Sequence, residues 1–361
     1  MIGTRKEPKE VEREGLLLAL DFGGTKLTAG AVSTSELAAS GERRWWAHRR
    51  VPSPPGSNAQ SDLEIMMGLA RDLLATAEAP LAAVGVSFGG PVDAARGLVL
   101  LSHHVPGWEE MPLREWLEER LGVPAAVDND ANAGALGEYR FGAGQGYDSL
   151  MYITVSTGVG GGWILNGQPW RGADGMAGEI GHTVVDPDGP VCLCGKRGCV
   201  ERLASGPYVA QRAREWLKAQ PDGGRILRAL AEGDPLIRSG QAPSVHSGQA
   251  LEAITAKLVA QAAAQGDDLA WEALEIAARA LGVGIGNAAN LVNPRCFVLG
   301  GGVTKAGERF WEVMGRTARE TALPEVRFDV VPAALGDDAP LWGGVALAEA
   351  QVQRTSEVRC T

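Results

Sequence analysis

The sequence has no long apolar run and no cluster of basic residues. Its first fifteen residues, MIGTRKEPKEVEREG, are charged and lack the apolar core of a signal peptide, and no later stretch reaches the length of a membrane span. The formal charge of −10 argues against binding nucleic acid through phosphate neutralisation. We therefore expect a cytoplasmic protein that binds neither nucleic acid nor a membrane, with residues 1–14 forming a disordered N-terminal tail.

Cysteine is also scarce, with five residues among 361, yet three of the five lie within eight positions. In a reducing compartment, clustered cysteines are more often metal ligands or redox groups than disulfides. A histidine precedes the first of them by ten residues, and one imidazole with three thiols suits a closed, tetrahedral zinc site. A redox pair or merely buried thiols would need neither the histidine nor the flanking Gly195 and Gly198. We predict a structural Zn²⁺ held by His182, Cys192, Cys194 and Cys199, with Cys296 and Cys360 as bystanders.

The length of 361 residues favours two domains, and a strand–glycine–strand pattern occurs twice along the chain. LLLAL (Leu16 to Leu20) is followed by DFGGTK and then LTAGAV (Leu27 to Val32). LMYITV (Leu150 to Val155) is followed by STGVGGG and then WIL (Trp163 to Leu165). The spacing predicts short buried strands joined by glycine hairpins in an α/β protein.

The two glycine loops differ from a Walker loop, which needs a following helix and a Gly-Lys-Ser/Thr ending. Glycine lets backbone N–H groups approach an anion closely, and Thr25 and Lys26 add a hydroxyl and a charge. For each loop alone, an ordinary tight hairpin is the favoured interpretation. Two matching loops favour a nucleotide bound between the halves. A third cluster, CFVLGGGVT (Cys296 to Thr304), follows a predicted helix from about Leu269 to Leu291 and can accept an adenine ring or a ribose.

Asp130 lies in AAVDNDANAGALGEYRFG, where a strand ends and a helix is expected to begin. One interpretation is that Asp130 simply caps this helix, because Asp is favoured at that position. The other is that Asn129 and Asp130 face a ligand from the carboxyl end of the strand. An aspartate placed there can take the proton of a hydroxyl that attacks a phosphate.

Six motifs together resemble the ROK family of repressors, open reading frames and sugar kinases. LDFGGTK, NDANAGALGE, STGVGGG, AGEIGH, CLCGKRGCVE and VLGGGV occur in the family's order, between Leu16 and Glu349. The resemblance implies an actin-like ATPase (ribonuclease H-like) fold with two α/β domains around a cleft. The N-terminal domain would comprise residues 15–133 and a C-terminal helix at about 338–353. The second domain would comprise residues 134–337, with a zinc loop at 182–201.

The resemblance also implies roles for individual residues. Asp130 matches the base that acts on a sugar hydroxyl, commonly the 6-OH of a hexose, and Asp21 is expected to face Mg²⁺ through water. The sugar contacts would be Gly90, Asn129, Asp130, Glu179, His182 and Glu201, although Glu179 and Glu201 also suit solvated surface carboxylates. The ATP contacts would be Gly23, Gly24, Thr25, Lys26, Thr157, Gly158, Gly160, Gly161, Gly300 and Gly301.

The resemblance implies an ATP-dependent kinase, which we expect to convert glucose to glucose 6-phosphate. N-acetylmannosamine, N-acetylglucosamine, fructose, mannose and allose remain alternative substrates, and His104 stands where the family often has Asn. Sugar-responsive repressors of the family carry a helix-turn-helix domain, for which the 20 residues before Asp21 are too few. A non-catalytic sugar sensor would be expected to lack Asp130 or the glycine loops. A dimer or tetramer is expected from the family.

Two further segments carry weaker signals. The stretch from Gln220 to Ala250 is rich in Gly, Pro and Ser and is expected to form a surface excursion. Trp45, Trp46 and His48 form an aromatic group that reflects either packing or an oligomer surface.

Overall fold

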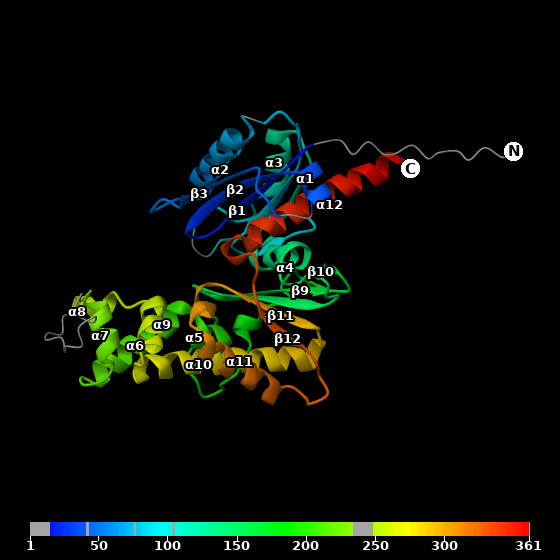
Figure 1. Cartoon of the computed structure of the whole chain (residues 1–361). Coiled ribbons are helices and arrows are strands. Elements are labelled where there is room, and N and C mark those ends of the chain that lie inside the picture. Colours follow the sequence, from blue (N-terminus) through cyan, green and yellow to red (C-terminus); the bar gives the residue numbers. More distant parts are fainter. Residues whose placement is uncertain (1–14, 41–42, 76, 103–104, 234–247, 361) are drawn as a thin grey trace. The chain divides into compact units, whose positions relative to one another are not determined.

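The computed structural model describes residues 15–360 except 41–42, 76, 103–104 and 234–247. The predicted tail at 1–14 and His104 lie outside the described residues. The chain divides into two compact units, shown in Figure 1. Unit 1 comprises Met1–Ala133 and Pro340–Thr361, and unit 2 comprises Gly134–Ala339. Within the described residues, no helix is both long enough and apolar enough to cross a membrane.

Unit 1 is built on a five-stranded sheet in the order β3-β2-β1-β4-β7. β1 pairs antiparallel with β2 and parallel with β4, so the first strand of the chain lies at the centre of the sheet. Its strands are β1 (Leu16–Phe22), β2 (Lys26–Ser33), β3 (Ala47–Pro52), β4 (Leu81–Phe88) and β7 (Ala125–Asn129), with a separate ribbon of β5 (Val92–Asp93) and β6 (Leu98–Val99).

Unit 2 repeats this topology in the sheet β10-β9-β8-β11-β12. β8 pairs antiparallel with β9 and parallel with β11, as β1 pairs with β2 and β4. Its strands are β8 (Leu150–Val155), β9 (Val159–Leu165), β10 (Gln168–Trp170), β11 (Cys296–Gly300) and β12 (Asp329–Pro332). The two predicted hairpins are therefore present, each at the corresponding place in its sheet.

Helices cover both faces of the unit 1 sheet. Alternating residues of β1, such as Leu18 and Leu20, are fully buried in a core shared with α2 and α3, while α12 packs on the opposite face. The helices of this part of the chain are α1 (Thr34–Ser40), α2 (Ala59–Leu74), α3 (Leu113–Leu121) and α12 (Ala339–Cys360). α4 (Asp130–Phe141) begins in unit 1 and continues in unit 2. Trp45 packs within unit 1, 4.4 Å from Trp342 between ring centroids.

Unit 2 has a larger helical layer centred on α10 (Asp268–Val292), which begins after the N-cap Asp267 and ends at left-handed Asn293 before Pro294. This matches the helix expected from the sequence. The other helices are α5 (Val200–Ala204), α6 (Gly206–Ala219), α7 (Arg225–Ala231), α8 (Gly248–Glu252), α9 (Ala256–Ala264) and α11 (Glu308–Thr321), with 3₁₀ turns η1 (Ile180–His182), η3 (Gly302–Lys305) and η4 (Gly336–Asp338).

Two details of the sequence interpretation were wrong. The glycines of STGVGGG were assigned to one loop, but β9 starts at Val159, so Gly160 and Gly161 lie inside the strand and pair with Thr154 and Ile153. The expected surface excursion after Gln220 includes α7, whose Leu227 is fully buried in the core of unit 2. Both errors arose because glycine-rich composition was interpreted as loop where packing maintains regular structure. Residues 234–247 of the excursion lie outside the described residues.

Glycine at position 85 is required by the contact between β4 and α12. A Cβ on Gly85 would lie 1.8 Å from the carbonyl oxygen of Gly344, which is backbone and cannot move aside. We expect Gly85→Ala to lower the free energy of unfolding by about 3 kcal/mol, because overpacking against backbone shifts a helix. Gly68→Ala is the control: nothing lies within 4 Å of that helical site, so a gain of about 0.5–1 kcal/mol is expected. Urea unfolding of the two variants measures the difference, and equal effects would contradict the packing argument.

Candidate active site

The β1–β2 hairpin places Asp21 beside the first glycine loop. The Gly23 N–H donates to the Lys26 carbonyl at 3.1 Å, which closes the turn and leaves Gly24 and Thr25 exposed at its tip. Asp21 is only 5% exposed, and its Oδ1 accepts a 2.8 Å hydrogen bond from the Ser87 hydroxyl on β4. The hairpin thus brings a buried carboxylate, near the end of β1, and Lys26, at the start of β2, to the same end of the two strands.

The pKa of Asp21 is raised to about 6, mainly by burial and also by the nearby Asp130 carboxylate, against the lowering effects of Ser87, Lys26 and Arg50. The ordinary value is 3.8, so the folded state holds a proton more tightly than the unfolded state. Stability is therefore lost as the pH rises from about 4 to 6, and the loss is constant above that range.

This shift predicts the behaviour of Asp21→Asn in buffer without Mg²⁺ or nucleotide. At pH 8 the variant should be more stable than the wild type by up to about 3 kcal/mol, because a shift of about two pKa units is removed. At pH 4 the difference should vanish. Denaturant unfolding at both pH values measures this difference in the free energy of unfolding. If the difference were the same at pH 4 and pH 8, ionisation of Asp21 would not be its cause.

Asn129 and Asp130 lie where β7 ends and α4 begins. The Asn129 side-chain oxygen accepts from the N–H groups of Ala131 at 3.0 Å and Asn132 at 3.3 Å, so Asn129 caps the helix. Its amide donates to the carbonyl of Gly90 at 3.0 Å. The Asp130 carboxylate accepts from the Ala131 N–H at 2.8 Å and lies close enough to influence Asp21. The residue that caps α4 is therefore Asn129 and not Asp130.

Gly90 lies where the backbone is closely packed. A Cβ there would be 2.7 Å from the Leu101 carbonyl oxygen, so the residue must be glycine for the segment at Leu101 to approach. Asp21, Gly90, Asn129 and Asp130 come from β1, the turn after β4, and the junction of β7 with α4. Unit 1 therefore brings its predicted site residues together at the carboxyl ends of neighbouring parallel strands.

In unit 2 the second glycine hairpin is tied to Glu201 on α5. The Val159 N–H donates to Glu201 Oε2 at 2.9 Å, and a Cβ on Gly158 would lie 2.8 Å from the same oxygen. Glu201 is thus half-buried and bonded, not a solvated surface carboxylate. Thr157 is exposed at the turn, which the Ser156 N–H closes by donating to the Gly158 carbonyl at 2.9 Å.

The segment from Glu179 to His182 packs against β9. A Cβ on Gly161 would lie 2.6 Å from the Gly178 carbonyl, and one on Gly181 would lie 2.0 Å from the Val159 carbonyl. The glycines inside β9 therefore allow η1 to approach the strand backbone directly. Glu179 is exposed just before η1, while His182 is half-buried at its end.

His182 joins Cys192, Cys194 and Cys199 in one cluster. Their ligand atoms all lie within 4.8 Å of one another. Cys192 Sγ is 3.9 Å from His182 Nδ1, and Cys194 Sγ is 3.5 Å from Cys199 Sγ. Zinc bonds of about 2.3 Å to sulfur and 2.1 Å to nitrogen place tetrahedral ligands just under 4 Å apart, so the donor set fits Zn²⁺.

Left-handed glycines shape the loop that carries these thiols. Gly195 has φ +86° and Gly198 has φ +59°, and a Cβ on Gly198 would lie 1.6 Å from the Asp186 carbonyl. Cys199 is fully buried and directly precedes α5, so the cluster lies one residue from the helix that carries Glu201. In unit 2, the predicted metal ligands therefore adjoin the predicted sugar contacts: His182 belongs to both groups, and Glu201 lies two residues after Cys199.

Gly300 ends β11, and Gly301 follows it directly. Gly301 has φ +94°, and a Cβ there would lie 2.3 Å from the Val155 carbonyl, so the turn requires glycine. The Thr304 hydroxyl donates to the Gly301 carbonyl at 2.8 Å and holds the turn to η3. Gly300 pairs with Thr154, so the third glycine cluster lies beside the end of β8 from which the second hairpin continues.

Sequence reasoning missed three residues that shape these sites. Ser87 donates to Asp21, Gly206 donates its N–H to the Ser156 carbonyl at 2.8 Å, and Glu138 binds three backbone N–H groups. Gly206 and Pro207 at a helix start gave a local signal for a turn. Ser87 gave none for its bond to Asp21, and Glu138 gave none for its bonds to Ala334 and Leu335, because these partners are distant in the sequence.

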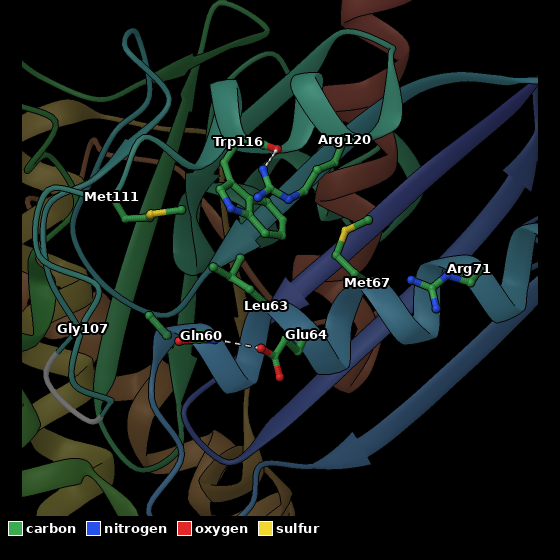
Figure 2. Close-up of a pocket in the computed structure, with 10 residues that line it drawn as sticks. Gln60, Leu63, Glu64, Met67, Arg71, Gly107, Met111, Trp116 and Arg120 are labelled. Carbon is green, nitrogen blue, oxygen red and sulfur yellow. Dashed lines mark hydrogen bonds between the residues drawn. The ribbon is translucent and has the colours of Figure 1, made fainter.

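A groove with a cavity volume of about 900 Å³ lies between α2 and α3 (Figure 2). Leu63 and Met67 of α2 face it, and Arg120 of α3 lies over the Trp116 ring, 3.8 Å from its centroid. The residues that line it include none of the predicted catalytic, sugar, ATP or metal residues. The groove is therefore distinct from the candidate site.

Comparisons with known proteins identify the family of the chain and several relatives. A model of the ROK family matches residues 17–351. The glucokinase of Streptomyces coelicolor is 33% identical over 337 residues, which cover 92% of this chain and 98% of that protein. The N-acetylmannosamine kinase of Escherichia coli is 32% identical over 334 residues, covering 92% and 98%. The crystal structure of a ROK family glucokinase from Streptomyces griseus with glucose and AMPPNP has a TM-score of 0.75 at 34% identity, covering 93% of this chain and all of that one.

Two α/β units, each with a glycine hairpin at a central strand, define an actin-like ATPase fold. This confirms the fold class predicted from the sequence. The chain belongs to the ROK family, and the resemblance based on its motifs is confirmed.

Proposed function

We propose that the chain is an ATP-dependent hexose kinase whose preferred substrate is glucose and whose product is glucose 6-phosphate. The observation that carries this proposal is the pair of carboxylates in unit 1. Asp21 and Asp130 lie close enough for one to raise the pKa of the other, at the strand ends beside the glycine hairpin. A phosphoryl transfer to a hydroxyl needs one carboxylate near the metal and phosphates and another near the attacking oxygen.

Asp130 is the catalytic base in this proposal. It takes the proton of the sugar 6-OH as that oxygen attacks the γ-phosphorus of ATP, the bond to the β-phosphate oxygen breaks, and ADP leaves. Asn129 caps α4 and bonds the Gly90 carbonyl, so the backbone that presents Asp130 is fixed at both sides. Proton transfer then needs no rearrangement of the strand end.

Mg²⁺ and ATP would be held mainly by backbone and by Asp21. Asp21 is buried and suited to a divalent cation, which would favour its ionised form. When bound, Mg²⁺ neutralises charge that develops on the phosphates. Lys26 and the loop from Gly23 to Thr25 would face phosphates, as would Thr157, Gly158 and Gly160, with Gly300 and Gly301 near the adenosine.

Zn²⁺ would be structural and held by His182, Cys192, Cys194 and Cys199. Nδ1 of His182 faces the thiol of Cys192, which leaves Nε2 for a sugar hydroxyl. Further sugar hydroxyls would be contacted by Glu179 and Glu201. Glu179 lies on the same segment as His182, and Glu201 follows Cys199 by two residues. The metal supplies rigidity, and the side chains recognise the substrate.

The preference for glucose is supported by the similarity to glucokinases along nearly the whole chain. N-acetylmannosamine is the alternative that a relative of similar identity supports. Coupled ADP release, measured with a panel of hexoses and N-acetylhexosamines, tests the choice. Glucose should give the highest kcat/KM. Higher kcat/KM for N-acetylmannosamine would replace glucose as the substrate and leave the kinase proposal intact.

A further inference from the structure

Glu138 is a fully buried carboxylate with no part in the catalytic scheme above. It lies on α4 in unit 2 with none of its surface exposed. Its Oε2 accepts from the N–H groups of Ala143 at 2.8 Å and Ala334 at 3.1 Å, and its Oε1 accepts from the Leu335 N–H at 2.8 Å. Burying a charge is costly unless hydrogen bonds compensate for the lost water. Three convergent donors supply that compensation and fix the segment that they come from.

The segment held by Glu138 borders the third glycine cluster. It follows β12, which runs beside β11 (Figure 1), and the Ala333 N–H donates to the Leu299 carbonyl at 2.8 Å. The Ala333 methyl lies 3.3 Å from where a Cβ on Gly300 would be. Any shift of residues 333–335 therefore changes the wall next to Gly300 and Gly301.

We propose that Glu138 is a positioning residue for the nucleotide. By fixing Ala334 and Leu335 it sets the shape of the site beside Gly300 that would receive the adenosine. The inference rests on the proposed function, because it takes the nucleotide to bind at this glycine cluster. Glu138 itself touches no substrate in this account.

The chemistry of the site explains why a carboxylate is needed. All three partners are N–H donors, and an ionised carboxylate has only acceptor sites. Glutamine would turn an NH₂ group toward at least one of these donors and leave it unbonded. Aspartate would keep two acceptor oxygens but reach one methylene less far.

Asp267 offers a matched control in the same unit. It is 5% exposed and also accepts from three backbone N–H groups, those of Ile226 at 3.0 Å, Leu227 at 3.1 Å and Ala270 at 3.0 Å. It holds the start of α10 and the first residues of α7, neither of which borders Gly300 in the contacts described. Asp267→Asn therefore disrupts the same kind of carboxylate–backbone contact, but at a place that does not border the proposed nucleotide site.

The test measures ADP affinity by titration calorimetry, Tm, and the sugar KM for the full-length wild type, Glu138→Gln, Glu138→Asp and Asp267→Asn. We expect ADP to bind about tenfold more weakly to Glu138→Gln, since small displacements of binding groups are costly, with the sugar KM within about twofold of wild type. Glu138→Asp should give an intermediate loss. Asp267→Asn should lower Tm while leaving ADP affinity within about twofold.

Two results would overturn the positioning role. One is ADP affinity within twofold of wild type for the Glu138 variants that fold; Glu138→Asp decides the matter if Glu138→Gln does not fold. The other is an equal loss of ADP affinity in Asp267→Asn, which would mean that any loss of stability weakens binding. A wild type that binds ADP but phosphorylates no sugar would contradict the proposed function instead, and the comparison of ADP affinities would still test Glu138.

Discussion

Asp130→Asn is expected to lower kcat for sugar phosphorylation by about 10³-fold, because a positioned general base contributes about 10²–10⁴-fold to such a step. Asparagine keeps the size of the side chain and an oxygen that can accept from the Ala131 N–H. The cap of α4 also survives, since Asn129 supplies it. Steady-state kinetics with saturating ATP and sugar measures the loss, and calorimetry should show ADP affinity within about twofold of wild type.

Asp128→Asn is the matched control for this result. Asp128 is 2% exposed on β7, two residues before Asp130, and its Oδ1 accepts from the Asn129 N–H at 2.9 Å and from the Asn132 side chain at 3.3 Å. We expect this variant to lose stability but to retain most of its kcat. If Asp130→Asn kept more than about a tenth of wild-type kcat, it would lack the effect of a general base.

Cys199→Ala is expected to abolish zinc binding and to weaken sugar binding by about tenfold or more, the scale on which supporting residues affect metal sites. Cys199 is fully buried, its Sγ lies 3.5 Å from that of Cys194, and it directly precedes α5 with Glu201. Without the metal, His182 and Glu201 lose their common support. Elemental analysis measures the zinc, and titration with the sugar substrate measures its affinity.

Cys296→Ala distinguishes loss of the zinc cluster from loss of any buried thiol. Cys296 is also fully buried in unit 2 but lies in β11 outside the cluster. It should keep one equivalent of zinc and unchanged sugar affinity. The zinc site would be contradicted if wild-type protein, prepared without chelators, held far less than one equivalent of zinc. Unchanged sugar affinity in a zinc-free Cys199→Ala would show that zinc does not support substrate binding.

Local sequence signals were sufficient to predict the hairpins and the grouping of His182 with three cysteines. Short apolar runs on either side of glycines predict β1, β2 and β8, because this pattern is typical of buried strands joined by tight turns. The cluster of His182 and three cysteines could be predicted because thiols are rare elsewhere in the chain. Asp130 and Asn129 were correctly placed at the start of a helix, although which of them caps it depends on side-chain geometry.

The features that could not be predicted depend on long-range contacts. Gly160 and Gly161 resemble loop residues locally, yet β8 pairing and the approach of Gly178 keep them in a strand. Glu138 accepts from the N–H groups of Ala334 and Leu335, which follow it by 196 and 197 positions in the sequence. Ser87 donates to Asp21, which precedes it by 66 positions. No local pattern encodes such partners, so the residues that position the candidate site emerged only from the fold.

The most direct test of the central claim is to identify the product formed from ATP and glucose by wild type and by Asp130→Asn. Phosphorus NMR of the wild-type reaction should show glucose 6-phosphate formed in equal amount to ADP, and the Asp130→Asn reaction should show almost none in the same time. If wild type formed no sugar phosphate from glucose or any other sugar of the panel, or if both proteins formed it equally fast, the account of a hexose kinase with Asp130 as its base would be contradicted.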